Sequence, residues 1–400
     1  MTKLEQCRAE IDRVDKEICA LYERRMRIVE GVAQYKIEHG LPVLQSSRED
    51  AVLQRAQDAV SEAAYRPGVR RVFETLMEVS RSMQTGMLDD AAREAKTACS
   101  ACDPVCGGEY AGAPTGTAAV LPLPEGLPIG FQGEEGSFSE AALIQAYGVD
   151  APRRNYPRFA DVFEALRRGE IGCGVLPIEN SSTGGINEVY DLLHQYDFFI
   201  TGEEYVAVRH HLLGLPGASI DGVREVRSHS QGLEQSRGFL SRHPAMRGVP
   251  WLNTAAAALS VAEQKDTSVA AIASSRAASL YGLEILAHDV NDRGDNTTRF
   301  VLVERRRCIR PQSDKVSVVF SLDDKSGTLY KLLGYFFEQS VNLVKIESRP
   351  LTGSRWKYFL YVDLQGSVES APVARALRDI EAHADYFRLL GSYRAKEAQR

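Results

Sequence analysis

A chain of 400 residues is too long for a single hydrophobic core, so its length predicts roughly two to four domains. Its composition, with 44% hydrophobic and 26% charged residues, is typical of soluble globular proteins. The net charge of -6 is spread along the sequence without a basic block, which argues against nucleic acid and anionic membranes as partners. No segment is apolar enough for a secretory signal or a membrane span, and the seven cysteines are scattered. We therefore expect a cytoplasmic protein with reduced thiols.

The first part of the chain, residues 1–87, is rich in helix-forming residues and contains only two prolines. This pattern predicts an all-α domain with a long first helix, a shorter helix from about Arg48 and a third helix after Pro67. Residues 88–127 are dominated by Ala, Gly, Pro, Thr and Cys. We interpret them as a linker, because they offer too little apolar surface to offset the entropy lost on ordering.

Three cysteines of this linker stand close together, at Cys99, Cys102 and Cys106. Three thiolates can bind zinc, but a structural zinc site needs four ligands, and no fourth ligand is evident nearby. We therefore expect no metal in this protein.

Apolar residues recur along the first helix at spacings of three and four, which indicates a coiled-coil-like packing seam. They are Leu4, Cys7, Ile11, Val14, Ile18, Leu21, Ile28, Val32 and Tyr35. Arg25 belongs to the same seam, and Arg8 and Lys36 flank it. A buried arginine needs an anionic partner, which can be a glutamate of the protein or an anionic ligand.

Residues of the second and third helices favour an anionic ligand over a glutamate of the protein as the partner of Arg25. The inward row of the third helix continues from apolar residues into Ser80 and Gln84, two hydrogen-bonding groups one turn apart. Arg48 and Glu49 open the second helix. Polar groups that converge on the interior of a helical domain suggest a water-poor pocket for a small polyanion.

The separation of two arginines adds a prediction about assembly. Arg8 and Arg25 are 17 residues apart, which is about 25 Å along a helix at 1.5 Å per residue. They cannot hold one small ligand from the same helix. If both serve the site, Arg8 comes from another protomer, and we expect an intertwined homodimer or a higher homo-oligomer.

In type and spacing, these residues resemble the site of the all-helical chorismate mutases, a family of helical homodimers that rearrange chorismate to prephenate. The matching residues are Arg8, Arg25, Lys36, Arg48, Glu49, Ser80 and Gln84. The resemblance implies that Lys36 and Gln84 act on the ether oxygen of chorismate. It implies that the other five bind the carboxylates and the ring hydroxyl, and that catalysis is positioning with electrostatic stabilisation. Gln45 stands where the family pattern leads us to expect an aspartate, so a mutase that has decayed to a dimerisation domain stays open as an alternative.

The middle of the chain, residues 128–304, alternates short apolar runs with amphipathic helices, which predicts an α/β domain. Glycines at 130, 133 and 136 follow a strand, but their spacing differs from that of a dinucleotide site, so we expect no NAD and no other cofactor. They more readily form a tight turn that exposes Ser137 and Ser139 to an anion at a helix start.

Three segments are rich in polar residues. PIENSS at 177 ends a predicted strand, SHSQGLEQS comes later at 228, and DNTTRF at 295 is a polar loop from which Thr298 and Arg299 open a strand. They resemble prephenate dehydratase over nearly all of residues 128–304. The resemblance implies two α/β lobes like those of a periplasmic binding protein, with prephenate in the cleft between them. The implied reaction gives phenylpyruvate by loss of carbon dioxide and hydroxide.

The same resemblance implies roles for single residues. Thr298 would donate a hydrogen bond to the leaving hydroxyl. The substrate would be bound by Asn180, Ser181, Gln235 and Arg299. His229 is either an acid or a structural hydrogen bonder, and the sequence does not distinguish prephenate from arogenate as the substrate.

The last part, residues 315–395, has the predicted order βαββαβ, which is the ferredoxin-like α+β plan. It resembles the ACT regulatory domains, which bind phenylalanine at a subunit interface. The matching segments are Gly327, Thr328 and Leu329 at a helix start, and Glu347, Ser348, Arg349 and Pro350 after a strand. The resemblance implies feedback inhibition by phenylalanine.

Over its whole length the chain thus resembles the bifunctional chorismate mutase/prephenate dehydratases of phenylalanine biosynthesis. A different class of function stays open, namely a non-catalytic ligand sensor built from two binding lobes and an ACT domain. Loss of Thr298 or of the cations of the helical site would favour that sensor, and all of them are present.

Overall fold

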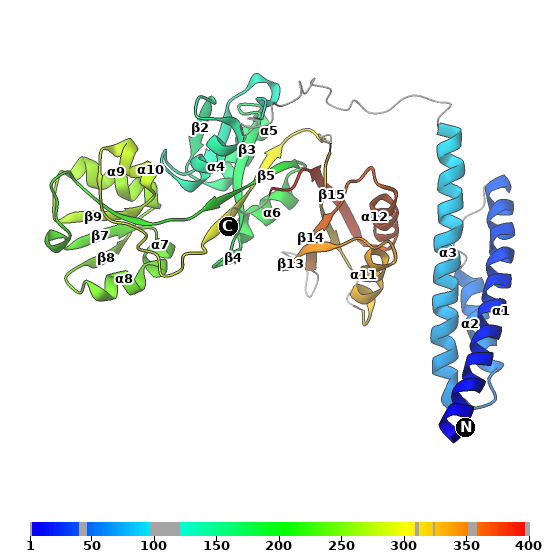
Figure 1. The fold of residues 1–400 in the computed structure, drawn as a ribbon. Coiled ribbons are helices and arrows are strands. Elements are labelled where there is room, and N and C mark those ends of the chain that lie inside the picture. Colours follow the sequence, from blue (N-terminus) through cyan, green and yellow to red (C-terminus); the bar gives the residue numbers. More distant parts are fainter. Residues whose placement is uncertain are drawn as a thin grey trace. The chain divides into compact units, whose positions relative to one another are not determined.

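A computed structural model shows the fold, which divides into two compact units, Met1–Asp103 and Pro104–Arg400 (Figure 1). It describes residues 2–39, 46–96, 121–308, 312–322, 325–350 and 358–396. Gln45 and the cysteines at 99, 102 and 106 lie outside the described residues, so the hypotheses about them stay predictions. In the described ranges, no helix is both long and apolar enough to cross a membrane.

The first unit is all-α, as the sequence predicts. It consists of α1 (Lys3–His39), α2 (Ser46–Asp58) and α3 (Arg66–Lys96), with a short 3-10 turn at Ala63–Tyr65. Its small core joins one side of α1 to the other two helices, and includes Met26, Ala33, Leu53 and Met77. Helix α3 continues to Lys96, past residue 87 where the sequence placed the start of the linker.

The apolar seam of α1 is not buried within this unit. Leu4, Ile11 and Ile18 keep 57–60% of their surface exposed, whereas Val29 and Ala33 are buried. The seam residues after Arg25 are exposed as well, with Ile28 at 62% and Tyr35 at 56%, so within the described residues of this unit no helix covers the predicted seam.

The second unit begins with a mixed sheet in the order β2-β1-β3-β11-β5, with β4 paired to β3. The strands are β1 (Ile129–Gln132), β2 (Arg153–Tyr156), β3 (Cys173–Asn180), β4 (Gly184–Gly185), β5 (Phe199–Ala207) and β11 (Thr297–Glu304). The helices of this lobe are α4 (Phe138–Tyr147), α5 (Phe159–Arg168) and α6 (Asn187–Gln195). Strand β3 is buried along nearly its whole length, as its apolar sequence predicts.

A second lobe is inserted between β5 and β11, with a sheet in the order β10-β6-β9-β7-β8. Its strands are β6 (His211–Gly214), β7 (Glu225–Ser228), β8 (Arg247–Pro250), β9 (Val269–Ala273) and β10 (Glu284–Ala287). Its helices are α7 (Ser230–Gln235), α8 (Arg237–Arg242), α9 (Thr254–Gln264) and α10 (Ser275–Tyr281). The chain therefore crosses twice between two α/β lobes, which confirms the predicted two-lobed architecture.

The third sheet is antiparallel and has the strand order β13-β14-β12-β15. The elements are β12 (Lys315–Ser321), α11 (Thr328–Glu338), β13 (Leu343–Pro350), β14 (Tyr358–Gln365), α12 (Ala371–His383) and β15 (Tyr386–Tyr393), so the predicted βαββαβ order is confirmed. One face packs on α11 and α12 through residues such as Val318 and Phe320. The opposite face places Tyr361 and Tyr393 in one hydrophobic core with the first lobe.

Candidate functional site

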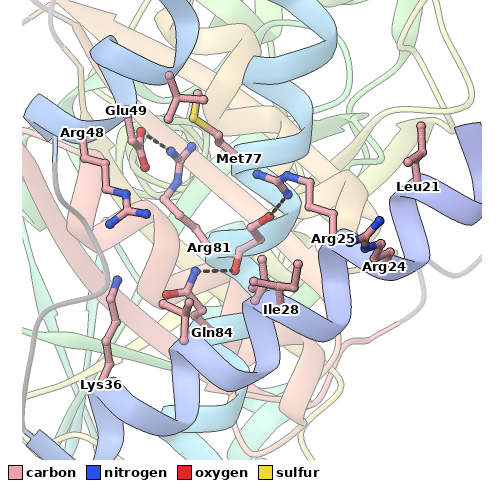
Figure 2. A pocket seen from close by; sticks show the side chains of 14 residues that line it. Leu21, Arg24, Arg25, Ile28, Lys36, Arg48, Glu49, Met77, Arg81 and Gln84 are labelled. Carbon is pink, nitrogen blue, oxygen red and sulfur yellow. Dashed lines mark hydrogen bonds and ion pairs between the residues drawn. The ribbon is translucent and has the colours of Figure 1, made fainter. Parts of the chain in front are cut away.

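The helical unit contains a cavity of about 480 Å³ between its three helices. Six of the predicted residues line it: Arg25, Lys36, Arg48, Glu49, Ser80 and Gln84. Figure 2 shows Lys36, Arg48 and Gln84 turned toward one another from the three helices. Residues that the sequence analysis predicted in three different helices therefore line one cavity.

Hydrogen bonds fix the deepest part of this pocket. The Arg25 guanidinium donates to the Leu76 carbonyl at 2.9 Å and to the Ser80 hydroxyl. The Gln84 amide donates from Nε2 to the Ser80 carbonyl at 3.2 Å. Ser80 and Gln84 are buried, so these polar groups face a site with little water.

Positive charge dominates the helical pocket. Its lining includes five basic side chains and one carboxylate: Arg24, Arg25, Lys36, Arg48, Arg81 and Glu49. Glu49 pairs with Arg81 at 2.5 Å. Burial lowers the pKa of Lys36, the nearby Arg48 lowers it further, and Glu49 raises it. Burial also lowers the pKa of Arg25. An anionic ligand would relieve the unfavourable burial and repulsion of these cations, so the pocket suits a small dianion.

Three arginines mark where sequence and structure differ in this unit. Arg8 is exposed and does not line the pocket of its own chain. Arg24 and Arg81 line the pocket but were not predicted from the sequence. Each directly follows or precedes a predicted residue, and neighbours in a helix point in different directions, so the periodicity offered no reason to include them.

A second cavity, of about 390 Å³, lies in the cleft between the two α/β lobes. The first lobe contributes polar residues that include Gln132, Ser137, Ser139, Asn180, Thr183 and Thr298. Facing them from the side of the second lobe are His210, His229, Gln231, Gln235, Asn253 and Thr254. Within the described residues, this lining contains no lysine, arginine, aspartate or glutamate.

Thr298 and Asn180 lie side by side at the ends of two paired strands. They are direct partners in the antiparallel pairing of β11 with β3. The Asn180 Nδ2 donates to Thr298 Oγ1 and to Asn296 Oδ1, each at 2.8 Å. Because Thr298 Oγ1 accepts this bond, the hydrogen of its own hydroxyl is left to donate into the cleft.

The orientation of the Asn180 amide follows from the turn after β3. Asn180 Oδ1 accepts hydrogen bonds from the backbone amides of Ser182 at 2.9 Å and Thr183 at 3.2 Å. An asparagine oxygen that closes such a turn leaves its amide nitrogen on the other side. The nitrogen must therefore face Thr298, and this fixes the threonine as the acceptor.

Gln235 connects the second lobe to the same turn. Its Oε1 accepts from His210 Nε2 at 3.1 Å and from Asn296 Nδ2 at 3.0 Å. Its Nε2 donates to Ser182 Oγ at 2.9 Å. Burial lowers the pKa of His210 to about 4, so this imidazole is neutral near pH 7. No motif in the sequence pointed to His210, which follows β5 in the chain.

Two helices begin at the cleft, one from each lobe. Ser137 caps α4 by accepting from the Glu140 amide at 3.3 Å, and Asn253 caps α9 by accepting from the Ala256 amide at 2.7 Å. The N-terminus of a helix has a partial positive charge and free amides. These ends therefore supply positive potential to a cleft whose described lining contains no lysine or arginine.

Two residues predicted to bind substrate, Ser181 and Arg299, do not line the cavity of the cleft, and their binding roles stay predictions. Ser181 Oγ donates to the Asp295 carbonyl and accepts from the Thr297 amide, each at 3.0 Å, and it does not line the cavity. Arg299 follows Thr298 in a strand, where successive side chains point to opposite faces. Its guanidinium accordingly bonds Glu203 on the far side of the sheet.

His229 lines the cleft, where its Nδ1 accepts from the Gln231 amide at 3.3 Å and caps α7. This contact is the structural hydrogen bond that the sequence left open beside an acid role. The acid role stays a prediction.

A buried carboxylate joins the two lobes behind the cleft. Glu140 of α4 is 1% exposed, and it contacts Arg276 of α10 at 2.8 Å and Arg153 at 3.3 Å. Next to it, the Ser274 hydroxyl donates to the Gly136 carbonyl at 2.8 Å. A side chain at Gly136 would meet Ala277 at about 3.1 Å, and its φ of 88° also requires glycine.

The segments predicted to bind an effector lie on α11 and β13. Gly327 begins α11 with a φ of 85°, and Leu329 is 44% exposed. On β13, Arg349 contacts Asp191 of α6 at 2.9 Å, while the side chain of Ser348 belongs to the opposite, exposed row. Within the described ranges, no group of three or more His, Cys, Asp or Glu residues could hold a metal ion.

Comparisons with known proteins identify relatives of this chain. Residues 129–308 match the family described as prephenate dehydratase, and residues 7–85 match chorismate mutase type II. A bifunctional chorismate mutase/prephenate dehydratase of Aquifex aeolicus is 30% identical over 398 residues, which cover 98% of both chains. Arogenate dehydratase/prephenate dehydratase 2 of Arabidopsis thaliana is 39% identical over 66% of this chain and 72% of its own. A crystal structure of a prephenate dehydratase from Arthrobacter aurescens in complex with L-Phe is 33% identical, with a TM-score of 0.63, and covers 67% of this chain and 90% of that chain.

Proposed function

We propose a division of labour between the two pockets of this chain, which belongs to the bifunctional chorismate mutase/prephenate dehydratase family. The chain is an isomerase that converts chorismate to prephenate, and a lyase that converts prephenate to phenylpyruvate in phenylalanine biosynthesis. The helical pocket performs the first reaction and the cleft between the lobes performs the second.

The observation that supports this division is the contrast between the two linings. The helical pocket gathers five basic side chains and the Gln84 amide around one space, which suits a rearrangement that needs only positioning and charge stabilisation. The cleft is uncharged and presents one hydroxyl hydrogen held in place by an amide. That arrangement suits an elimination in which a hydroxide leaves.

In the first reaction, Arg25, Arg48 and Ser80 hold the carboxylates of chorismate. Lys36 and Gln84 donate to the ether oxygen, where negative charge grows as the carbon–oxygen bond breaks. Glu49 accepts from the ring hydroxyl, and its contact with Arg81 holds the carboxylate in place. Arg8 completes the site from a second protomer.

In the second reaction, the electron pair of the bond to the ring carboxylate moves into the ring as carbon dioxide leaves. The aromatic ring forms and the hydroxyl on the opposite carbon departs with its bonding electrons. Thr298 donates a hydrogen bond to this hydroxyl, and Asn180 holds Thr298 in that role. The carboxylates bind at the starts of α4 and α9 and near Gln235.

We further propose that residues 315–395 form an ACT domain that binds L-phenylalanine and inhibits the enzyme. The βαββαβ order of this part supports the assignment, and the Arthrobacter aurescens relative is described in complex with L-Phe. The effector residues are those of the two predicted segments: Gly327, Thr328, Leu329, Glu347, Ser348, Arg349 and Pro350.

Two exposed apolar surfaces support a homodimer. One is the uncovered seam of α1, which includes Ile11 and Ile18. The other lies on α11 and β13 beside the proposed effector segments, where Tyr330 is 75% and Phe337 is 84% exposed. A second copy that covers both surfaces would bury apolar area and bring Arg8 to the mutase pocket.

We propose domain boundaries at 1–87, 128–304 and 315–395, with α3 extending into the linker. We also propose that the protein is located in the cytoplasm. Relatives with both activities match the chain over its whole length, so a decayed mutase is not favoured. A preference for arogenate stays possible in the cleft, since plant relatives described as arogenate dehydratases match this part of the chain.

Single substitutions test the division of labour. We expect Arg25→Ala to lower mutase turnover by about a hundredfold and to leave prephenate dehydration unchanged, since it removes a carboxylate contact from one pocket. Thr298→Val should lower dehydratase turnover at least about tenfold and leave the mutase unchanged. If either substitution abolished both reactions, the two pockets would not be separate sites.

A further inference from the structure

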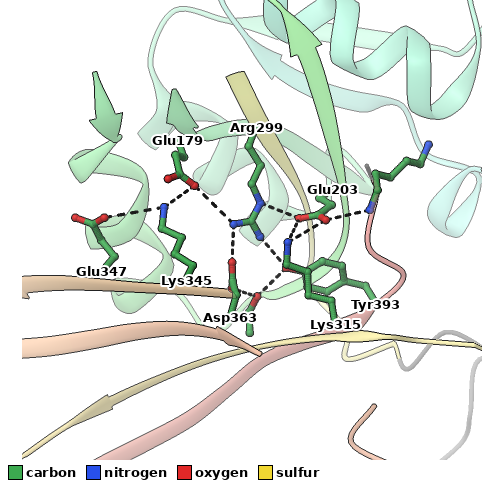
Figure 3. A network of polar contacts seen from close by, with 10 residues as sticks. Glu179, Glu203, Arg299, Lys315, Lys345, Glu347, Asp363 and Tyr393 are labelled. Carbon is green, nitrogen blue, oxygen red and sulfur yellow. Dashed lines mark hydrogen bonds and ion pairs between the residues drawn. The ribbon is translucent and has the colours of Figure 1, made fainter. Parts of the chain in front are cut away.

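Arg299 is the centre of a buried ion network behind the dehydratase cleft (Figure 3). Its Nε contacts Glu203 of β5 at 2.7 Å, its Nη1 contacts Asp363 of β14 at 2.5 Å, and its Nη2 donates to the Tyr393 hydroxyl of β15 at 3.0 Å. Only 5% of the arginine side chain is exposed. The three acceptors are separated from it by 64 to 96 residues in the sequence.

The network joins the C-terminal sheet to the first lobe. Glu203 also contacts Lys315 of β12 at 2.8 Å, and Asp363 accepts from the Ser317 hydroxyl. Burial would raise the pKa of Asp363, but the charges of Arg299 and Lys315, with the hydrogen bonds from Ser317 and Arg299, together lower it. An ionised carboxylate at this position accepts from the Arg299 guanidinium, which therefore has a fixed set of acceptors.

A second ion pair makes the same connection at the neighbouring strand. Lys345 of β13 places its ammonium 2.7 Å from Glu179, which directly precedes Asn180 on β3. The Glu347 carboxylate lies 4.0 Å from the same ammonium. Thr298 and its hydrogen-bond partner Asn180 thus each have a sequence neighbour with an ion pair to the C-terminal sheet.

We propose that Arg299 and Glu179 are positioning residues, through which the C-terminal sheet fixes the register of Thr298 and Asn180 in the dehydratase cleft. This inference rests on the proposed role of Thr298 in dehydration. It makes the C-terminal sheet a part of the catalytic framework of the cleft, in addition to its proposed regulatory role.

The geometry of the strands explains why such positioning matters. Thr298 pairs with Asn180, and Arg299 pairs with Glu179, directly across the two strands. The pairing is irregular immediately after Arg299, so the backbone hydrogen bonds there do not hold the strands in a uniform register. An anchor on the far face can therefore decide where the Thr298 hydroxyl points.

A pair of tyrosine variants separates positioning from mere stability. Tyr393→Phe removes the hydroxyl that accepts from Arg299, while the ring stays packed in the core. Tyr361→Phe is a matched control, because the Tyr361 hydroxyl also bonds the first lobe from the C-terminal sheet, but reaches the Tyr190 carbonyl of α6 at 2.8 Å. Both variants lose one buried hydrogen bond between the same two parts, and Tyr393→Phe also loses the contact with the Ser317 hydroxyl at 2.7 Å within the C-terminal sheet.

We expect Tyr393→Phe to lower dehydratase kcat by about threefold to tenfold with little change in KM, since a small displacement of a catalytic group reduces turnover more than binding. Lys345→Met should lower kcat in the same way. Tyr361→Phe should lower the melting temperature but keep kcat, and mutase activity should stay unchanged in all three full-length variants.

The experiment distinguishes failure of the positioning role from failure of the proposed function. A wild-type protein that does not dehydrate prephenate contradicts the proposed function itself. A wild type that is active, with Tyr393→Phe and Lys345→Met both as fast as Tyr361→Phe, contradicts the positioning role alone. Equal loss of kcat in all three variants would also overturn it, since any weakening of the interface would then suffice.

Discussion

A single amide determines which way the catalytic hydroxyl points. Asn180 donates from Nδ2 to Thr298 Oγ1 because its oxygen is engaged by the turn at Ser182 and Thr183. The threonine therefore keeps its own hydrogen for the cleft. The direction in which the Thr298 hydroxyl donates therefore depends on Asn180 as well as on Thr298.

Asn180→Asp tests the direction of this hydrogen bond with almost no change in side-chain volume. A carboxylate accepts where the amide donated, so it would capture the hydrogen of Thr298 and turn it away from the substrate. We expect dehydratase kcat to fall at least about tenfold, as far as in Thr298→Val, with no further loss in the double variant. Unchanged turnover, with mutase activity as the internal control, would contradict the assigned direction of this hydrogen bond.

Glu140 acts at the residue scale on stability and not on chemistry. Burial would raise its pKa, but the hydrogen bond from Arg276, the Gly136 amide and the charges of Arg276 and Arg153 together lower it. A lowered pKa in the folded state stabilises the fold above the ordinary value of 4.5, and this stabilisation is lost as the pH falls through the folded value.

Glu140→Gln should therefore destabilise the second unit in a pH-dependent way. We expect the free energy of unfolding at pH 7 to fall by about 2 kcal/mol, since the variant leaves partly exposed arginines without their buried partner. Denaturant titrations should show the gap to wild type narrowing as the pH falls below 4.5, where the carboxyl of the unfolded chain is protonated first, and closing as the pH falls through the lower folded pKa. A gap that stays constant down to acid pH would exclude the ionised pair as its source.

At the scale of elements, helix α1 is long enough to serve two sites. Its half from Arg25 onward lines the pocket of its own chain, and its earlier half exposes an apolar seam with Arg8 beside it. If two chains exchange these halves, each mutase site contains Arg25 of one chain and Arg8 of the other.

Mixing two inactive variants tests this exchange. Arg8→Ala and Arg25→Ala should each lack mutase activity as homodimers. After joint unfolding and refolding in equal amounts, half of the dimers are mixed, and each mixed dimer has one intact site. We therefore expect about a quarter of the wild-type activity to return. No recovery, with mixed dimers present by native mass spectrometry, would mean that Arg8 does not reach the pocket of the other chain.

The same elements show which site residues could be predicted from the sequence and which could not. Spacing along α1 and α3 identified Arg25, Ser80 and Gln84, because a helix face repeats every three to four residues. It could not say whether the seam meets its own chain or another copy. On β11, the motif suggested Thr298 and Arg299 together, although strand alternation places neighbours on opposite faces. His210 was missed because it stands between Arg209 and His211 without a motif that marks either histidine as a site residue.

At the scale of the whole molecule, the C-terminal sheet connects a proposed effector site with a catalytic cleft. Glu347 belongs to the proposed effector segment, Lys345 lies two residues before it, and Glu179 next to Asn180 pairs with that lysine. This chain of contacts gives phenylalanine a physical route to the cleft, provided that binding changes the position of β13.

Lys345→Met should accordingly weaken inhibition without abolishing binding. We expect the fraction of dehydratase activity that remains at saturating phenylalanine to rise at least about twofold, because the ion pair that couples β13 to β3 is gone. Calorimetry on the same variant should still detect phenylalanine. An unchanged residual activity would mean that inhibition reaches the cleft by another route.

The central claim is that one chain performs both reactions and that phenylalanine limits the second. The most direct measurement is to supply the purified protein with chorismate and to follow chorismate, prephenate and phenylpyruvate with and without phenylalanine. Phenylpyruvate should appear, and its formation should slow when phenylalanine is added. Accumulation of prephenate without phenylpyruvate, or no consumption of chorismate by a protein that still dehydrates added prephenate, would contradict the claim.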